Sequence, residues 1–152
     1  MVPSPKVPTY DNKPEMSSIQ VGQAVCDVLK KNAPFVMCNF APPDMVGHTG
    51  NYEKAILGVE ATDKAIGMIH KACVENKYTL FVTADHGNAE QMLNGEEPHT
   101  AHTCNPVPFY MAGSGAFITK SDAALCDVAP TILDFMGLPI PAEMTGSSLL
   151  KH

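Results

Sequence analysis

Two short, mainly apolar runs constrain the fold of this chain more than any other feature. Residues 35–40 read Phe-Val-Met-Cys-Asn-Phe, and residues 78–84 read Tyr-Thr-Leu-Phe-Val-Thr-Ala. Runs of this length without polar alternation are typical of strands covered on both faces, as in a parallel sheet. Between them, apolar residues recur with helical spacing from about residue 53 to 76. The sequence therefore predicts a layered α/β architecture with parallel strand pairing.

Three further elements follow from the same kind of pattern. Apolar positions at helical spacing predict a helix over residues 17–31, and residues 107–111 predict a third short strand. A last helix is expected after Asp127, which we expect to cap it, with Gly137 just beyond its end. Residues 88–106 are polar and predict a long loop.

Charge excludes one broad class of function. The ten basic residues are all lysines, there is no arginine, and sixteen acidic residues give a net charge of −6. A negative chain is poorly suited to a nucleic-acid backbone. A clamp on a carboxylate or phosphate must use lysine, a metal or another polypeptide, because arginine is missing.

Length and cysteine usage indicate the kind of protein and its compartment. A chain of 152 residues corresponds to one domain of ordinary size. No apolar run approaches the roughly 18 residues that span a bilayer, so we expect no membrane association. The five cysteines are scattered and form no Cys-x-x-Cys pair. Free thiols indicate a reducing compartment, and we expect the cytoplasm.

The first candidate ligand cluster follows the first apolar run. Asp44 and His48 lie four positions apart, so on one helical turn they face the same side and suit two ligands of one metal ion. The alternative is an aspartate that caps a helix and an unrelated surface histidine.

The second cluster, Asp85-His86-Gly87, ends the second apolar run. Neighbouring side chains at a strand end diverge, so this pair can serve one ion through a twisted loop or two ions held close together. A polar turn is the alternative, because aspartate and glycine both favour turns.

The third cluster contains His99 and His102, which are either ligands or two solvated imidazoles on a loop. Carboxylates and imidazoles at three separate strand ends strengthen the ligand interpretation, because sheets of this class place ligand sites at the carboxyl ends of their strands. Oxygen and nitrogen donors without organised cysteines suit Mn²⁺, Mg²⁺ or Zn²⁺.

Two other residues carry weaker signals. Ser114 lies in a Gly-Ser-Gly sequence, but its flanks do not form the Gly-x-Ser-x-Gly pattern of a nucleophile elbow. Lys6 lies among prolines, where an exposed lysine is the default interpretation.

Several longer motifs resemble those of cofactor-independent phosphoglycerate mutase, a member of the alkaline phosphatase superfamily. The resemblance covers essentially the whole chain. It rests on Pro-Ser-Pro-Lys-Val (3–7), Asn-Phe-Ala-Pro-Pro-Asp-Met-Val-Gly-His-Thr-Gly (39–50), Thr-Ala-Asp-His-Gly-Asn-Ala-Glu (83–90), His-Thr-Ala-His-Thr (99–103), the stretch 127–138 and Met-Thr-Gly-Ser-Ser-Leu (144–149). Aspartate–histidine turns alone would indicate only the wider superfamily.

The resemblance implies a glycolytic isomerase that interconverts 3-phosphoglycerate and 2-phosphoglycerate through a phosphoserine and two Mn²⁺ ions, with Mg²⁺, Co²⁺ or Zn²⁺ as alternatives. By motif, the ligands of one ion are Asp44, His48 and His102, whereas Asp85 and His86 are two ligands of the other. Lys6 corresponds to the lysine that approaches the transferred phosphoryl group. The implied fold is a three-layer, alkaline-phosphatase-like sandwich with a mainly parallel sheet.

The family pattern also contains parts that this sequence lacks. The family's nucleophilic serine, a further aspartate ligand and an arginine-bearing transferase domain have no counterpart here. We therefore expect residues 1–152 to be the C-terminal segment of the phosphatase-like domain, with a sheet that is incomplete at its N-terminal side. Such a segment is expected to be inactive alone and to self-associate. The alternatives are another metal-dependent phosphatase or phosphomutase of the superfamily, and a non-catalytic metal-binding module.

Overall fold

The computed structural model describes residues 1–113 and 122–151. The chain divides into a first unit, Met1–Gly113, and a second unit, Ser114–His152. The first unit contains, in order, η1 (Tyr10–Asn12), α1 (Ser18–Leu29), α2 (Pro42–Gly47), α3 (Tyr52–Asn76), β1 (Leu80–Thr83), β2 (Leu93–Asn94), β3 (Glu97–Pro98) and β4 (Phe109–Ala112). The second unit contains η2 (Leu125–Asp127) and α4 (Val128–Phe135). Helices with a small sheet confirm the predicted α/β class.

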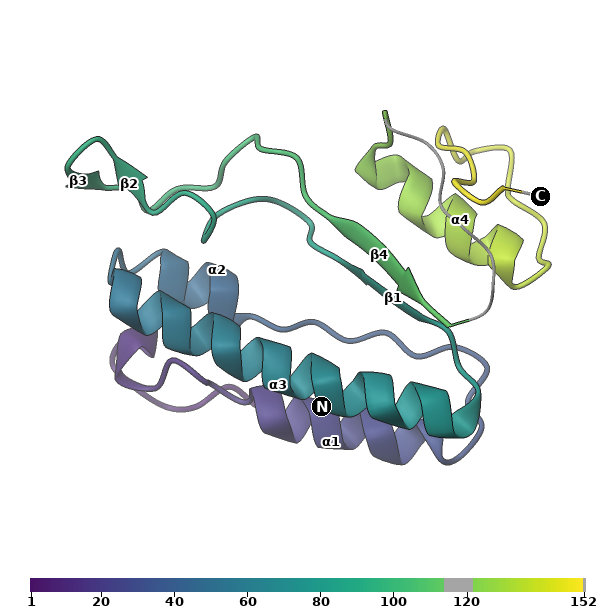
Figure 1. Cartoon of the computed structure of the whole chain (residues 1–152), viewed down its shortest axis with the longest axis horizontal. Coiled ribbons are helices and arrows are strands. Elements are labelled where there is room, and N and C mark those ends of the chain that lie inside the picture. Colours follow the sequence, from purple (N-terminus) through teal and green to yellow (C-terminus); the bar gives the residue numbers. More distant parts are fainter. Residues whose placement is uncertain (114–121, 152) are drawn as a thin grey trace. The chain divides into compact units, whose positions relative to one another are not determined.

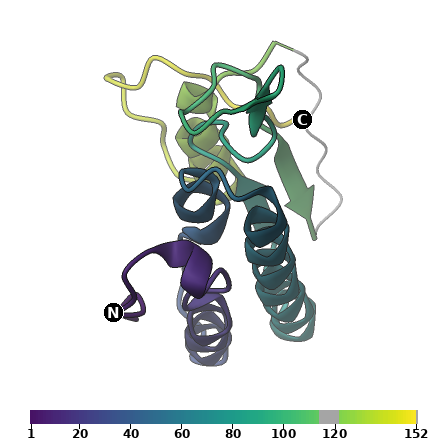
Figure 2. The same cartoon turned by 90° about the vertical axis from the view of Figure 1, so that its left-hand side faces the viewer.

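Helices α1 and α3 lie side by side and form the main support of the first unit (Figures 1 and 2). The Asn51 side chain caps α3 by accepting a 3.2 Å hydrogen bond from the Lys54 N–H. Lys77 ends the helix in a left-handed conformation, with φ at 60°. The core between the two helices consists of Val25, Cys26, Leu29, Ile69, Ala72 and Cys73. Both predicted helices therefore exist, with boundaries within two residues of the prediction.

Residues 35–40 differ from the prediction. They form no strand, and no backbone hydrogen bond within the described part of the chain joins them to another segment. Val36 and Phe40 pack against the α1/α3 core, whereas Phe35 is 52% exposed and Met37 is 84% exposed. One face of the segment is thus covered by helices, and the other face is open. The prediction of a strand buried on both faces is wrong because no strand of residues 1–113 or 122–151 flanks the segment.

Strands β1 and β4 form the larger of the two small sheets, and their pairing is antiparallel, with Leu80 opposite Ala112 and Thr83 opposite Phe109. The prediction of parallel pairing is therefore wrong for the described residues. Parallel strands need a crossover, usually a helix, whereas residues 84–108 return as a loop that contains only the β2–β3 hairpin. The two strands nevertheless fall close to the predicted positions.

Helix α2 brings the end of the open segment back onto α3. Val46 is fully buried and packs with Ala55 of α3 and with Met92 of the loop that follows β1. This second apolar cluster holds α2 and that loop at the same end of α3, so polar residues on both segments can meet there.

The second unit is organised around α4. Gly137 has φ at +67°, and its N–H donates to the Asp134 carbonyl while the Leu138 N–H donates to the Leu133 carbonyl. This pair of bonds forms a Schellman motif, and Gly137 stands just beyond the helix end, as the sequence predicted. Asp127 does precede the helix, but its side chain does not cap it. It accepts instead from the backbone N–H groups of Ala124, at 2.9 Å, and Ser147, at 2.8 Å.

Among residues 1–113 and 122–151, no helix combines the length and the apolar character needed to cross a membrane.

Candidate metal centre

The short helix α2 places two of the predicted ligands on one side. Its first turn carries Asp44, and His48 follows its last residue, with the His48 N–H bonded to the Asp44 carbonyl at 3.0 Å. The one-turn spacing brings His48 Nε2 to 3.1 Å from Asp44 Oδ1. The N-cap residue of α2 is Ala41, and Asp44 lies inside the helix, so Asp44 is not the cap that the alternative supposed.

A backbone bridge brings the other two histidines together. Gly87 and Thr103 form an isolated antiparallel bridge, in which the Thr103 N–H donates to the Gly87 carbonyl at 2.8 Å. The neighbouring residues His86 and His102 therefore lie face to face, with ring centroids 3.6 Å apart and planes 16° from parallel. Two loops separated in sequence thus contribute one imidazole each to the same place.

Three histidine side chains converge on one oxygen atom of Asp44. Asp44 Oδ1 lies 3.1 Å from His48 Nε2, 3.2 Å from His102 Nε2 and 3.9 Å from His86 Nε2. His48 Nε2 and His102 Nε2 are themselves 3.1 Å apart. Ligand donor atoms of Asp44, His86 and His102 all lie within 4.8 Å of one another. The cluster is partly open, because the His102 side chain is 50% exposed.

These separations fit a divalent ion. With metal–ligand distances of about 2.1 Å and angles of 90–109°, two ligand atoms of one ion stand about 3.0–3.4 Å apart. The three separations among Asp44, His48 and His102 fall in that range. The tautomer of His48 also fits, because its Nδ1 lies 2.6 Å from the Thr100 carbonyl and must donate to it. That bond leaves the Nε2 lone pair directed at the cluster.

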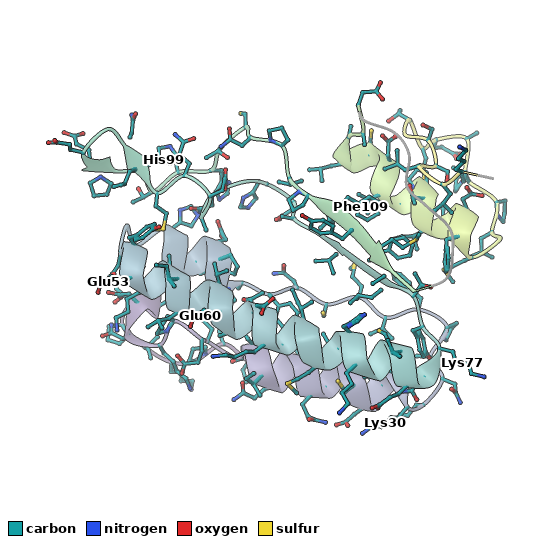
Figure 3. All side chains as sticks on the ribbon, in the orientation of Figure 1. Lys30, Glu53, Glu60, Lys77, His99 and Phe109 are labelled. Carbon is teal, nitrogen blue, oxygen red and sulfur yellow. The ribbon has the colours of Figure 1, made fainter. Side chains whose placement is uncertain are left out.

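The remaining predicted residues lie at the edge of this cluster or apart from it. Asp85 is 87% exposed, and its Oδ1 is 3.8 Å from His86 Nε2. His99 lies beside the β2–β3 hairpin (Figure 3), where its Nδ1 is 3.0 Å from the Gln91 carbonyl oxygen. It is not a member of the cluster. Lys6 is exposed, and the described structure gives it no contact with the cluster. Ser114 lies outside the described residues.

Sequence reasoning missed a hydrogen-bonded group beside the cluster. Asn88 is 4% exposed and donates from Nδ2 to Asp44 Oδ1 at 2.7 Å. Glu90 accepts from the Asn88 N–H at 2.6 Å, from the Thr103 hydroxyl and from the Asn105 amide at 3.0 Å. Burial alone would raise the pKa of Glu90, but these bonds and one from its own N–H lower it below the ordinary value. Both residues lie in the stretch 83–90 that carries the family resemblance, but neither their type nor their spacing indicated a role.

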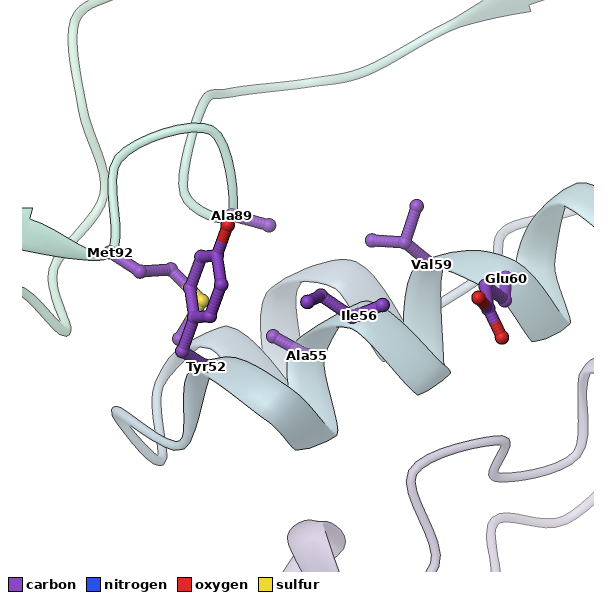
Figure 4. Close-up of a pocket in the computed structure, with 7 residues that line it drawn as sticks. All are labelled: Tyr52, Ala55, Ile56, Val59, Glu60, Ala89 and Met92. Carbon is purple, nitrogen blue, oxygen red and sulfur yellow. The ribbon is translucent and has the colours of Figure 1, made fainter.

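The first unit also has an apolar pocket of about 190 Å³ between α3 and the loop after β1 (Figure 4). Its lining consists of Tyr52, Ala55, Ile56, Val59, Glu60, Ala89 and Met92. Glu60 is the one ionisable carboxylate in that lining. The pocket therefore lacks the converging donors that the histidine–aspartate cluster provides.

Comparison with known proteins finds a matching family and several similar proteins. A family model described as the metalloenzyme superfamily matches residues 1–140. A 2,3-bisphosphoglycerate-independent phosphoglycerate mutase of Brugia malayi is 58% identical over 158 residues, which cover 100% of this chain and 31% of that protein. A protein of the same name from Moorella thermoacetica is 51% identical, over 99% of this chain and 29% of its own length.

A solved structure has a similar fold. The crystal structure of Leishmania mexicana phosphoglycerate mutase at low cobalt concentration matches with a TM-score of 0.91 and 31% identity, over 99% of this chain and 31% of that one. The likeness confirms the fold class. The chain spans about a third of the length of the relatives it matches.

Proposed function

The chain belongs to the metalloenzyme superfamily, and on that basis we propose that it is part of a cofactor-independent phosphoglycerate mutase. In this proposal residues 1–152 are a segment of the phosphatase-like domain, and the whole protein interconverts 3-phosphoglycerate and 2-phosphoglycerate in glycolysis. The observation that carries the proposal is the convergence of Asp44, His48 and His102 at mutual distances of 3.1–3.2 Å. The names and high identities of the relatives support the choice of reaction.

We assign the residues as follows. Asp44, His48 and His102 hold one divalent ion, and Asp85 and His86 provide part of the site for a second. When bound, such ions stabilise a nucleophilic oxyanion and the charge of a transferred phosphoryl group. The lysine at position 6 contributes a further positive charge to that phosphoryl group. Mn²⁺ is our first choice of ion, because the donors are oxygen and nitrogen with no cysteine among them. Mg²⁺, Co²⁺ and Zn²⁺ suit the same donors.

The chain's own residues have separate tasks in this scheme. The Thr100 carbonyl fixes the His48 tautomer, so that Nε2 remains a lone-pair donor. The Gly87–Thr103 bridge keeps two imidazoles stacked at the centre. We place the activity in the cytoplasm, which is consistent with five cysteines that are all free thiols.

A chimera tests the proposal directly. The stretch of the Brugia malayi relative that this chain matches is replaced by residues 1–152, and turnover is followed in an enolase-coupled assay with Mn²⁺. We expect mutase activity in the chimera and its loss in Asp44→Ala, because that substitution removes the oxygen on which the cluster converges. The isolated chain is expected to show no turnover, since it lacks a nucleophilic serine and an arginine clamp. A folded chimera without activity, or an isolated chain with Asp44-dependent activity, would contradict the proposal.

A further inference from the structure

The Asp44 carboxylate has a neutral neighbour, the side-chain amide of Asn88. Asn88 Nδ2 donates to Asp44 Oδ1 at 2.7 Å and also lies 3.4 Å from the Asp44 carbonyl oxygen. Oδ1 is the same atom that faces the nitrogens of His48 and His102. The amide and the two imidazoles therefore all approach the same oxygen.

Close packing leaves Asn88 little freedom. Its side chain lies against α2 at Gly47, where a Cβ atom would stand 2.5 Å from Asn88 Oδ1. Only glycine permits this approach, because any other residue would displace the amide. The Asn88 Oδ1 atom is itself buried and has no hydrogen-bond partner in the described part of the chain. The hydrogen bonds of this side chain are therefore those that its Nδ2 group donates to Asp44.

The backbone N–H of Asn88 is also hydrogen-bonded, to the carboxylate of Glu90. Glu90 Oε2 accepts the Asn88 N–H at 2.6 Å, and Glu90 Oε1 accepts from Thr103 and Asn105. Thr103 directly follows His102 and forms the bridge to Gly87. The same carboxylate thus connects the loop that carries Asn88 to the loop that carries His102.

A fixed donor matters here because an aspartate carboxylate is easily rotated. The terminal torsion of Asp has a broad, roughly two-fold preference, so nothing intrinsic selects which oxygen faces the histidines. A donor at 2.7 Å to one named oxygen makes that selection before any ion arrives. Ligating carboxylates in metal sites are characteristically oriented in this way by outer hydrogen bonds.

We infer that Asn88 is a positioning residue that holds the Asp44 carboxylate in the orientation required to bind a divalent cation. The inference rests on the proposed metal site. It goes beyond that site by assigning a role to a neutral, buried side chain that does not itself bind the ion. Removing the amide should weaken divalent-ion binding by about 10- to 100-fold, the usual effect of losing an outer partner of a ligand.

The test uses Co²⁺ as the probe, because its visible absorption reports the ligand set as well as occupancy. Wild type, Asn88→Ala and Asp44→Ala are titrated with Co²⁺ while affinity and the spectrum at saturation are recorded. Asn94→Ala, at an exposed asparagine of β2, is the matched control. Far-UV circular dichroism of the metal-free proteins establishes that each is folded. Asn88→Asp serves as a second variant that keeps the side-chain shape and replaces the donor by an acceptor.

We expect Asn88→Ala to bind Co²⁺ more weakly and, at saturation, to show a spectrum that differs from wild type. Asn94→Ala should match wild type in both respects. A purely structural role for Asn88 would lower affinity without altering the saturated spectrum, and that result would overturn the inference. The same holds if both Asn88 variants are folded and bind Co²⁺ like wild type. If wild type shows no Asp44-dependent spectrum, the metal site itself is refuted, and the inference falls with it.

Discussion

Replacing Met37 with lysine tests whether the open face of residues 35–40 drives self-association. This segment lacks strand partners within the described residues, and its Phe35 and Met37 side chains are largely exposed. Segments with unpaired backbone groups and apolar side chains pair readily with other chains. We therefore expect the isolated chain to form dimers or larger assemblies through this face.

The size of the effect follows from the exposure of the residue. Met37 is 84% exposed, so an interface can bury nearly all of it. Complete burial of such a side chain contributes about 1.5–3 kcal/mol. A symmetric dimer buries two copies, so Met37→Lys should cost about 3–6 kcal/mol of association free energy. At about 1.4 kcal/mol per tenfold, dimerisation weakens by roughly 10²- to 10⁴-fold.

Sedimentation velocity over a range of protein concentrations, in metal-free buffer, measures this change. Val74→Lys is the matched control, because Val74 is an exposed apolar residue of α3, 64% accessible, outside the segment. It should leave association unchanged. A wild-type chain that is monomeric at every concentration and unfolds in one sharp step would refute the reasoning. Equal association of Met37→Lys and wild type would do so as well.

Four further outcomes are expected. Leu29→Ala, at a residue 3% exposed in the α1/α3 core, should lower the free energy of unfolding by about 2–5 kcal/mol in a urea titration. Calorimetry should detect at most one firmly bound Mn²⁺ per chain and none in His102→Ala, because Asp85 and His86 form only half of a second site. Mn²⁺ at about 100 times its Kd should raise stability by about 2.7 kcal/mol, measured by thermal melting. Because folding lowers the pKa of Glu90, ionised Glu90 stabilises the fold at pH values above its ordinary pKa of 4.5. This stabilisation is lost as the pH falls through the lowered pKa of the folded state. Glu90→Gln should therefore flatten the acid limb of a stability–pH curve.

Local patterns in the sequence predicted helices α1, α3 and α4, but neither the short helix α2 nor the direction of strand pairing. Helix α3 was expected over 53–76 and is found at Tyr52–Asn76, because its apolar stripe lies within one continuous segment. The direction in which β1 and β4 pair depends on the path of residues 84–108, which no local pattern encodes. The apolar run 35–40 indicated a strand, but a strand also requires a neighbour, and the sequence of the run cannot supply one.

In the candidate site, too, spacing along the chain predicted contacts between residues close in sequence, but not contacts between distant loops. The four-residue spacing of Asp44 and His48 was sufficient to predict that they face the same side. The stacking of His86 on His102 depends on a bridge between two loops and could not be read from spacing. Asn88 stood within the motif 83–90 but received no role, because a single amide in a loop has no distinctive pattern in the sequence. Its 2.7 Å hydrogen bond to Asp44 is what distinguishes it.

The way in which the cluster is assembled has a consequence for the order of folding. Asp44 and His102 are 58 positions apart in the chain, whereas the α1 and α3 core is built largely from helical segments. Distant loops are closed late, after local structure has formed, and they open more often in the native state. The Thr103 amide, bonded to Gly87, should then exchange its hydrogen through local opening, while amides around Ile69 exchange only when the whole unit unfolds. Slower hydrogen exchange of the Thr103 amide after a divalent ion is added would show that ion binding stabilises the closed arrangement of these two loops.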